Sequence, residues 1–193
     1  MSELALADFV AMRGGRRLFA PLTAGYDRGQ CVALLAPNGA GKTTMVRTLV
    51  GLHQQYEGSF RIGQLGYQGH RLGLDELLTP IENLRWSGAL CGLVPEDRTI
   101  RQVLDRVGVL ALAQAPIGRL SQGQQRRVAL ARLLISGAPL WVLDEPMTAL
   151  DDAGQALLNQ LLNEHCQGGG IALCSTHQAI AATTDVLHLE PIL

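Results

Sequence analysis

Residues 36–44 read Ala36-Pro37-Asn38-Gly39-Ala40-Gly41-Lys42-Thr43-Thr44 and directly follow the apolar run Cys31-Val32-Ala33-Leu34-Leu35. The run predicts a buried strand. A glycine-rich turn between a strand and a helix directs several backbone N–H groups at one point, beside the positive end of the helix. We therefore predict a loop that binds the phosphates of a nucleotide. In such a loop Lys42 reaches the β- and γ-phosphates, and the Thr43 hydroxyl holds a Mg²⁺ ion.

The first position of this loop departs from the usual pattern, which has glycine where this chain has Ala36. A methyl group is a small intrusion there if the backbone angle φ is negative, but it causes strain if the loop requires a positive φ. An ordinary glycine-rich turn without a nucleotide remains the alternative interpretation.

The composition bounds the class of protein. A chain of 193 residues has the size of one domain, with room for a subdomain. With 47% hydrophobic and 17% charged residues it is predicted to be a compact α/β protein rather than a disordered one. A formal net charge of −1 argues against a nucleic-acid partner. No apolar run is long enough to span a membrane and no signal peptide is recognisable, so we expect the chain on the cytoplasmic side.

The pattern along the chain predicts one domain over residues 1–193. Alternation in the first thirty residues indicates short antiparallel strands, and apolar spacing indicates a helix over 42–52. Residues 63–73 are rich in turn-forming residues. Residues 75–135 show helical spacing and no strand pattern, so we expect a helical subdomain there. Further strands are predicted at 140–143, 171–174 and 186–189, and a helix at 152–166 that is capped by Asp151 or Asp152. We therefore expect an α/β fold with a mostly parallel core sheet, an N-terminal antiparallel part and an inserted helical subdomain.

Two carboxylates, Asp144 and Glu145, follow the predicted strand 140–143. The carboxyl end of a parallel strand is where α/β sheets usually place their chemistry. If the loop holds a Mg²⁺-nucleotide, Asp144 can bind the metal through water, and Glu145 can polarise the water that attacks the γ-phosphate. A solvated turn before Pro146 is the alternative.

Three further motifs carry a family resemblance. Leu120-Ser121-Gln122-Gly123-Gln124 resembles the signature sequence of the ATP-binding cassette (ABC) ATPases, usually Leu-Ser-Gly-Gly-Gln, with Gln122 in place of the first glycine. Ala149-Leu150-Asp151 resembles the D-loop of that family, and Ser175-Thr176-His177 resembles its switch histidine. The motifs occur in the family's order, and the resemblance covers essentially the whole chain. It implies a P-loop NTPase fold, ATP hydrolysis and a γ-phosphate sensor at His177.

The signature segment is also predicted to act on an anion. Ser121 and the N–H group of Gly123 open a helix, and a helix N-terminus attracts negative charge. Within one chain this end is expected to lie far from residues 36–44. The resemblance implies that it faces the γ-phosphate bound by a second copy, so that two chains sandwich two nucleotides. Arg126 and Arg127 are expected to be solvated or structural charges, with direct phosphate contact as the alternative.

A narrower resemblance comes from Gly69-His70-Arg71-Leu72-Gly73-Leu74, where His70 occupies the position of the family's loop glutamine. This pattern, the short chain and the segments 123–132 and 175–178 resemble the ATP-binding subunits of cytochrome c maturation systems. The resemblance implies an ATPase that energises haem export or release of the haem chaperone. It would act at the cytoplasmic face of the bacterial inner membrane, as a peripheral subunit with integral membrane partners that handle haem. A lipid, peptide or metal exporter, and an ATP-dependent clamp with weak hydrolysis, are the alternatives.

The aromatic side chain expected to stack on the nucleotide base near residue 13 is replaced by Arg13, whose flat guanidinium can stack. The preference for ATP over GTP therefore rests on the resemblance. The predicted catalytic residues are Asp144, Glu145 and His177, and the predicted Mg²⁺ ligands are Thr43 and Asp144. The predicted nucleotide-binding residues are Arg13, Ala36, Pro37, Asn38, Gly39, Ala40, Gly41, Lys42, Thr43, Thr44, His70, Ser121, Gln122, Gly123 and Gln124.

Overall fold

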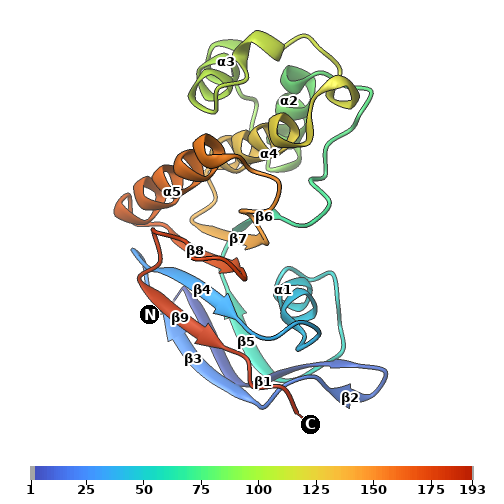
Figure 1. Ribbon diagram of the computed structural model, residues 1–193, viewed down its shortest axis with the longest axis vertical. Helices are drawn as coiled ribbons and strands as arrows, with labels where there is room; N and C mark the ends of the chain where they lie inside the picture. Colours follow the sequence, from blue (N-terminus) through green and yellow to red (C-terminus); the bar gives the residue numbers. More distant parts are fainter. Residues whose placement is uncertain (1–2, 193) are drawn as a thin grey trace. The chain divides into compact units, whose positions relative to one another are not determined.

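A computed structural model describes residues 3–192, and the chain divides into two compact units (Figure 1). Unit 1 contains the residues up to Tyr67, Pro139–Pro146 and the residues from Asn159 onward. Unit 2 contains Gln68–Ala138 and Met147–Leu158.

Unit 1 begins with an antiparallel sheet, as the first thirty residues predict. Its long strand β1 (Leu4–Arg13) pairs with β2 (Arg16–Arg17), β3 (Leu22–Tyr26) and β5 (Tyr56–Ile62), all antiparallel. The pairing of β1 shifts register after Leu6 toward β3 and after Ala7 toward β5. Asp8, at this bulge, has a positive φ of 49°. The sequence pattern did not predict β5.

The second sheet of unit 1 has five strands in the order β6, β7, β8, β4, β9. Their bounds are β6 (Leu65–Gln68), β7 (Leu140–Asp144), β8 (Ile171–Ser175), β4 (Cys31–Leu35) and β9 (Asp185–His188). The pairs β7 with β8, β8 with β4, and β4 with β9 are parallel, which confirms a mostly parallel sheet. The turn-rich interpretation of 63–73 is wrong for Leu65–Gln68, because pairing in the sheet outweighs the local preference of the nearby glycines for turns.

Helix α1 (Lys42–Leu49) lies between the two sheets and contacts β1 and β5 on one side and β7 and β8 on the other (Figure 1). Its fully buried Met45 and Val46 join Phe9, Leu34 and Leu173 in one apolar core. The helix ends earlier than the predicted residue 52, because Val50 is its C-cap and Gly51 adopts a left-handed φ of 79°. The packing of α1 between the sheets anchors the loop that precedes it.

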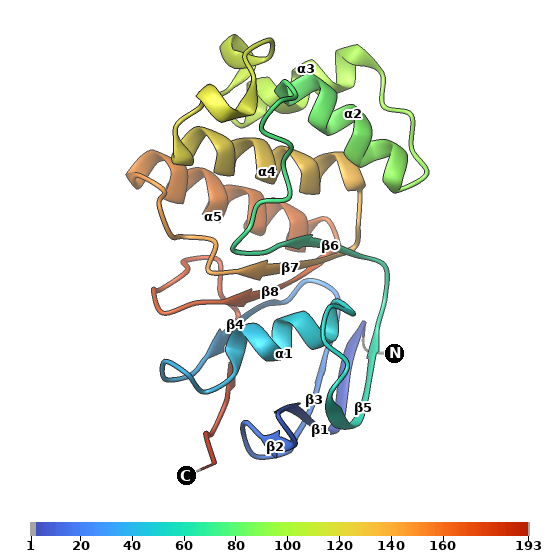
Figure 2. The same ribbon diagram turned by 90° about the vertical axis from the view of Figure 1, so that its right-hand side faces the viewer.

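Unit 2 is built mainly from helices, and no strand interrupts residues 75–135. Helices α2 (Pro80–Leu90), α3 (Asp97–Arg106) and α4 (Gln122–Ser136) pack on one another (Figure 2), with two short 3₁₀ turns at Leu110–Leu112 and Ile117–Arg119. Helix α5 (Asp152–Gln167) begins in unit 2 and continues into unit 1. Its cap is Asp151, whose carboxylate accepts the N–H of Gly154 at 2.8 Å.

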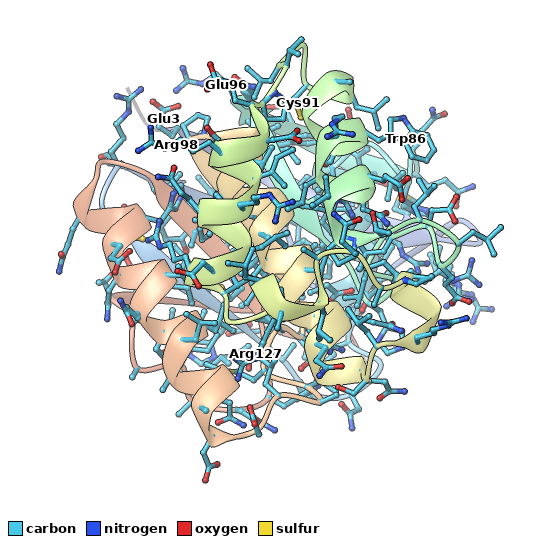
Figure 3. All side chains as sticks on the ribbon, turned by 90° about the horizontal axis from the view of Figure 1, so that it is seen from above. Glu3, Trp86, Cys91, Glu96, Arg98 and Arg127 are labelled. Carbon is cyan, nitrogen blue, oxygen red and sulfur yellow. The ribbon has the colours of Figure 1, made fainter. Side chains whose placement is uncertain are left out.

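Helix α2 exposes two large apolar side chains. Trp86, on the outer side of α2 (Figure 3), is 54% exposed, and Leu90 is 75% exposed. Among residues 3–192, no helix is both long and apolar enough to cross a lipid bilayer.

Gly58 provides a test of the antiparallel sheet. It has a φ of 76°, and a Cβ atom there would lie 2.2 Å from the carbonyl oxygen of Asp8. We expect Gly58→Ala to lower the free energy of unfolding by roughly 3 kcal/mol or more, measured by urea unfolding. Gly51→Ala is the control, because Gly51 has a φ of 79° and no neighbouring atom within 4 Å. It should cost only about 1–2 kcal/mol, so equal losses in the two variants would contradict the steric argument.

Candidate active site

The loop 36–44 connects β4 to α1 inside unit 1. Gly39 and Gly41 have positive φ angles of 79° and 100°, so both positions require glycine. At Gly41 a side chain would also meet the Cβ of Leu18 at 3.0 Å. Ala36 is not among the residues with positive φ, so its methyl group causes no backbone strain.

Replacement of Ala36 by glycine should therefore change little. We expect Ala36→Gly to alter nucleotide affinity by less than about threefold and to lower stability by no more than about 1 kcal/mol through added freedom of the unfolded chain. Equilibrium binding of a fluorescent ATP analogue and urea unfolding measure the two quantities. A gain of tenfold or more in affinity would indicate that the alanine distorts the loop.

The N-terminus of α1 differs from those of two other helices. Its N-cap, Gly41, offers no side-chain hydrogen bond, and its first turn contains no acidic residue. Helices α2 and α4 both begin with a complete capping box, at Thr79 with Glu82 and at Ser121 with Gln124. The first N–H groups of α1 are thus left for an external acceptor, and the helix dipole favours an anion there.

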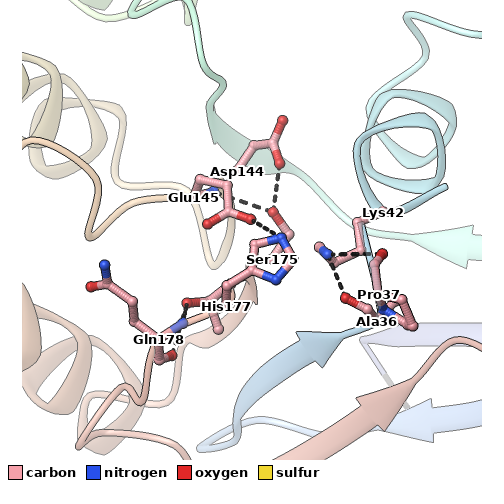
Figure 4. A network of polar contacts seen from close by, with 9 residues as sticks. Ala36, Pro37, Lys42, Asp144, Glu145, Ser175, His177 and Gln178 are labelled. Carbon is pink, nitrogen blue, oxygen red and sulfur yellow. Dashed lines mark hydrogen bonds and ion pairs between the residues drawn. The ribbon is translucent and has the colours of Figure 1, made fainter. Parts of the chain in front are cut away.

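Lys42 stands over this loop and is only 7% exposed. Its Nζ donates to the carbonyl oxygens of Ala36 at 2.7 Å and Pro37 at 3.5 Å (Figure 4). Burial lowers the pKa of the Lys42 ammonium, and the negative charges of Glu145 and Asp144 partly oppose this effect. The ammonium is therefore held in a partly dehydrated position. Its charge would strongly stabilise an anion bound there.

Lys42 is the only lysine in the sequence, so its pKa can be measured without overlap. We expect the NMR signal of ¹³C-methylated Lys42 to titrate at a lower pH in the folded chain than in the urea-unfolded chain, because burial disfavours its charged form. ATP should raise the midpoint, since phosphate stabilises the protonated form. A folded-state midpoint equal to the unfolded one would contradict the buried position.

A cavity of about 250 Å³ opens over the loop, within unit 1. It brings together residues from four separate parts of the sequence: Arg13 at the end of β1, the loop, Glu145 and His177. Thr43 is exposed and lines this cavity, so its hydroxyl can reach a ligand. The loop residues that line it are Pro37, Asn38, Gly39, Gly41, Lys42, Thr43 and Thr44.

The two carboxylates lie where β7 ends. Asp144 is its last residue and is 3% exposed, and Glu145 follows with a left-handed φ of 53°. The parallel register sets Asp144 opposite Ser175 of β8. The Ser175 hydroxyl donates to Oδ1 of Asp144 at 2.5 Å, and the N–H of Glu145 donates to both the carbonyl oxygen and Oγ of Ser175, at 3.0 and 3.2 Å.

Glu145 and His177 are in contact with each other in the lining of the cavity. Oε1 of Glu145 lies 3.3 Å from Nε2 of His177 (Figure 4), and both side chains are partly exposed to solvent. A carboxylate and an imidazole that contact each other beside an anion-binding loop can accept a proton from water and pass it on. The arrangement suits hydrolysis of a phosphate ester or anhydride.

Ala36 and Ala40 lie in the loop but do not line the cavity, and Ala40 is buried. The remaining predicted binding residues belong to unit 2. Ser121 and Gln124 bond to each other's backbone in the capping box of α4, and Gly123 lies in its first turn. His70 and Gln122 line a second cavity of about 560 Å³ that lies within unit 2.

Two arginines follow in the same helix. Arg126 is 6% exposed, so it is a buried rather than a solvated charge. Arg127 (Figure 3) donates to the carbonyl oxygen of Val107 and to Asp151, which fits a structural role.

Ser175 is the residue to which sequence reasoning assigned no role. The sequence contained a signal for it, since Ser175 directly follows the apolar run 171–174 and comes shortly before His177. The pairing of β7 with β8, and hence the contact with Asp144, could not be derived from that signal.

The comparisons with known proteins agree with this geometry. The sequence model of the ABC transporter family matches residues 19–148, more than half of the chain. The chain belongs to the ABC transporter family. As an ABC cassette it binds nucleotide and hydrolyses ATP.

Two curated relatives extend the match over more than nine tenths of this chain. The cytochrome c biogenesis ATP-binding export protein CcmA of Cupriavidus pinatubonensis is 40% identical, over 94% of this chain and 86% of the relative. The CcmA of Methylococcus capsulatus is 41% identical, over 93% of each chain. A solved ATP-binding subunit of an ABC transporter superposes with a TM-score of 0.88 at 25% identity, over 98% of this chain and 86% of that one. A second solved structure, an inward-facing ABC transporter of metal-chelate type, superposes with a TM-score of 0.83 at 25% identity. The match covers 98% of this chain and 80% of that one.

Proposed function

We propose that this ABC ATPase energises haem export, or release of the haem chaperone, in cytochrome c biogenesis. The observation that carries the proposal is the similarity, at 40% and 41% identity over more than nine tenths of this chain, to export proteins named for that process. The pattern around His70 supports the same assignment. The chain would act at the cytoplasmic face of the bacterial inner membrane, as a peripheral subunit.

The geometry of unit 1 supports a division of roles in ATP hydrolysis. Lys42 binds the β- and γ-phosphates, and the free N–H groups of α1 hold them against the loop. Glu145 orients the attacking water and accepts its proton as the oxygen forms a bond to the γ-phosphorus. His177, in contact with Glu145, senses the γ-phosphate. ADP and phosphate are the products.

The oxygen atoms present suit a Mg²⁺ ion. The Thr43 hydroxyl is exposed, and within residues 3–192 no hydrogen bond or ion pair engages Oδ2 of Asp144. Hydroxyl and carboxylate oxygens with water are the ligands that Mg²⁺ prefers. We propose that Thr43 and, through water, Asp144 hold it, and that the bound ion neutralises charge that develops on the phosphates.

The first turn of α4 supports a role for a second copy of the chain. Within the described part of the chain, residues 3–192, the N–H groups of Gln122 and Gly123 have no acceptor. These donors at a helix N-terminus suit the γ-phosphate of a nucleotide held by another copy. We propose that two chains close on two ATP molecules, and that integral membrane subunits use the movement.

The proposal is tested by deleting the gene and staining for covalently bound haem. We expect c-type cytochromes to disappear and non-covalent b-type cytochromes to remain. Expression of the chain should restore them, whereas Glu145→Gln at equal abundance should not. Purification of the tagged chain from solubilised membranes should also recover integral membrane subunits. Normal c-type cytochromes in the deletion strain would indicate a different cargo, such as a lipid, peptide or metal.

A further inference from the structure

We propose that Ser175 is a positioning residue for ATP hydrolysis, whose hydroxyl fixes the Asp144 carboxylate and the Glu145 backbone relative to each other. This inference rests on the proposed roles of Asp144 and Glu145. Ser175 is 0% exposed, so it does not meet the solvent, and it is not among the residues that line the nucleotide cavity. It would act only through its two neighbours (Figure 4).

The first of these neighbours is a buried charge. Asp144 is 3% exposed, and a buried carboxylate is costly unless hydrogen bonds compensate it. Within residues 3–192 the only hydrogen bond to its side chain comes from Ser175, at 2.5 Å to Oδ1. This bond sets the rotation of the carboxylate group and leaves Oδ2 as the oxygen available to the proposed water shell of the metal.

The second neighbour carries the proposed base. Glu145 has a φ of 53°, a conformation that costs a side-chain-bearing residue about 1–2 kcal/mol and persists only when the surroundings enforce it. The N–H of Glu145 is shared between the carbonyl oxygen and the hydroxyl of Ser175. Since the direction of the Glu145 side chain follows from its backbone, this anchor aims the carboxylate at the cavity and at His177.

The register of the sheet explains why one hydroxyl can serve both groups. Asp144 and Ser175 are paired in the parallel ladder of β7 and β8, so their side chains leave the sheet on the same side. Glu145 is the next residue along the chain. If the hydroxyl is removed, the carbonyl of Ser175 still accepts from Glu145 at 3.0 Å, so the strand end is retained. The loss should therefore affect the orientation of the two carboxylates more than the fold.

The experiment compares Ser175→Ala, Ser175→Thr and the parent chain. Steady-state phosphate release gives kcat, and a fluorescent ATP analogue gives the affinity with and without Mg²⁺. For Ser175→Ala we expect kcat to fall by about 10- to 100-fold, as for loss of a hydrogen bond to a charged group. Affinity for metal-free nucleotide should stay within about threefold, and the gain in affinity on adding Mg²⁺ should shrink. Ser175→Thr keeps the hydroxyl and should recover most of kcat.

Thr184→Ala is the matched control, because its hydroxyl likewise accepts from a backbone N–H, that of Cys31, at the opposite end of β4. It should leave kcat within twofold. The proposal is overturned if Ser175→Ala turns over ATP within twofold of the parent. It is also overturned if kcat and metal-free affinity fall together and the threonine variant does not recover them, because a structural defect would act that way. Full turnover by Glu145→Gln would instead refute the assigned base.

Discussion

Replacement of Glu145 by glutamine is expected to reduce ATP turnover by at least about 100-fold while leaving ATP affinity within a few-fold of the parent. The amide has nearly the shape of the carboxylate, but it cannot accept the proton of the attacking water. Glu145 lines the cavity without a hydrogen bond to the loop, so its replacement leaves the loop's own contacts to the phosphates in place. Phosphate release and equilibrium nucleotide binding, measured on the same preparation, separate the two effects.

The control for this variant is Glu96→Gln, an exposed glutamate at the start of α3 in unit 2 (Figure 3). It removes the same charge from the chain and should leave turnover unchanged. If Glu145→Gln hydrolysed ATP at the parent rate, Glu145 could not be the base. A parent chain that binds ATP but releases scarcely any phosphate in the same assay would instead favour an ATP-dependent clamp.

Replacement of Lys42 by alanine is expected to weaken ATP binding and to reduce kcat/KM by at least about 100-fold. Unlike Glu145, Lys42 should act on both the bound substrate and the transition state. Its ammonium is a buried positive charge within the loop. Its removal leaves the carbonyl oxygen of Ala36 without its donor, while that of Pro37 keeps the N–H of Ala40. A triphosphate would then face those two oxygens without a compensating charge.

The matched control is Arg98→Ala, which removes an exposed cation on α3 and should not affect binding. Thermal unfolding checks that Lys42→Ala remains folded. If its affinity for ATP stayed within threefold of the parent, the phosphates would have to bind elsewhere than over residues 36–44, and the assignment of the loop would be wrong.

Local signals predicted many of the elements correctly. The apolar run 31–35, the glycines of the loop and the spacing of Met45 and Val46 correctly predicted strand, turn and helix, because each depends on neighbours within a few residues. Segments with weak local signals were missed: β5 was not predicted and β6 was assigned to a turn-rich region. Both are strands because they pair with distant strands, β5 with β1 and β6 with β7.

In the candidate site, too, the residues were predicted from local motifs, whereas their contacts depend on the fold. Lys42, Asp144, Glu145 and His177 were predicted from motifs, but the contact between Glu145 and His177 appears only in three dimensions. The left-handed φ of Glu145 had no sequence signal, since that conformation is usual for glycine. Whether the methyl group of Ala36 strains the loop depended on the backbone angle φ at that residue. The structure shows that this φ is not positive.

The amino-acid sequence alone determined which groups are candidates for the chemistry: a loop predicted to bind phosphates, two carboxylates after a strand, a histidine that resembles the switch histidine, and a signature segment that opens a helix. Each is encoded by residues adjacent in the chain, so local geometry is enough to recognise it. Only the tertiary structure decided which of these groups meet. The alignment of Asp144 with Ser175 depends on the register between strands about thirty residues apart, and register is set by burial of whole strand faces rather than by any local motif.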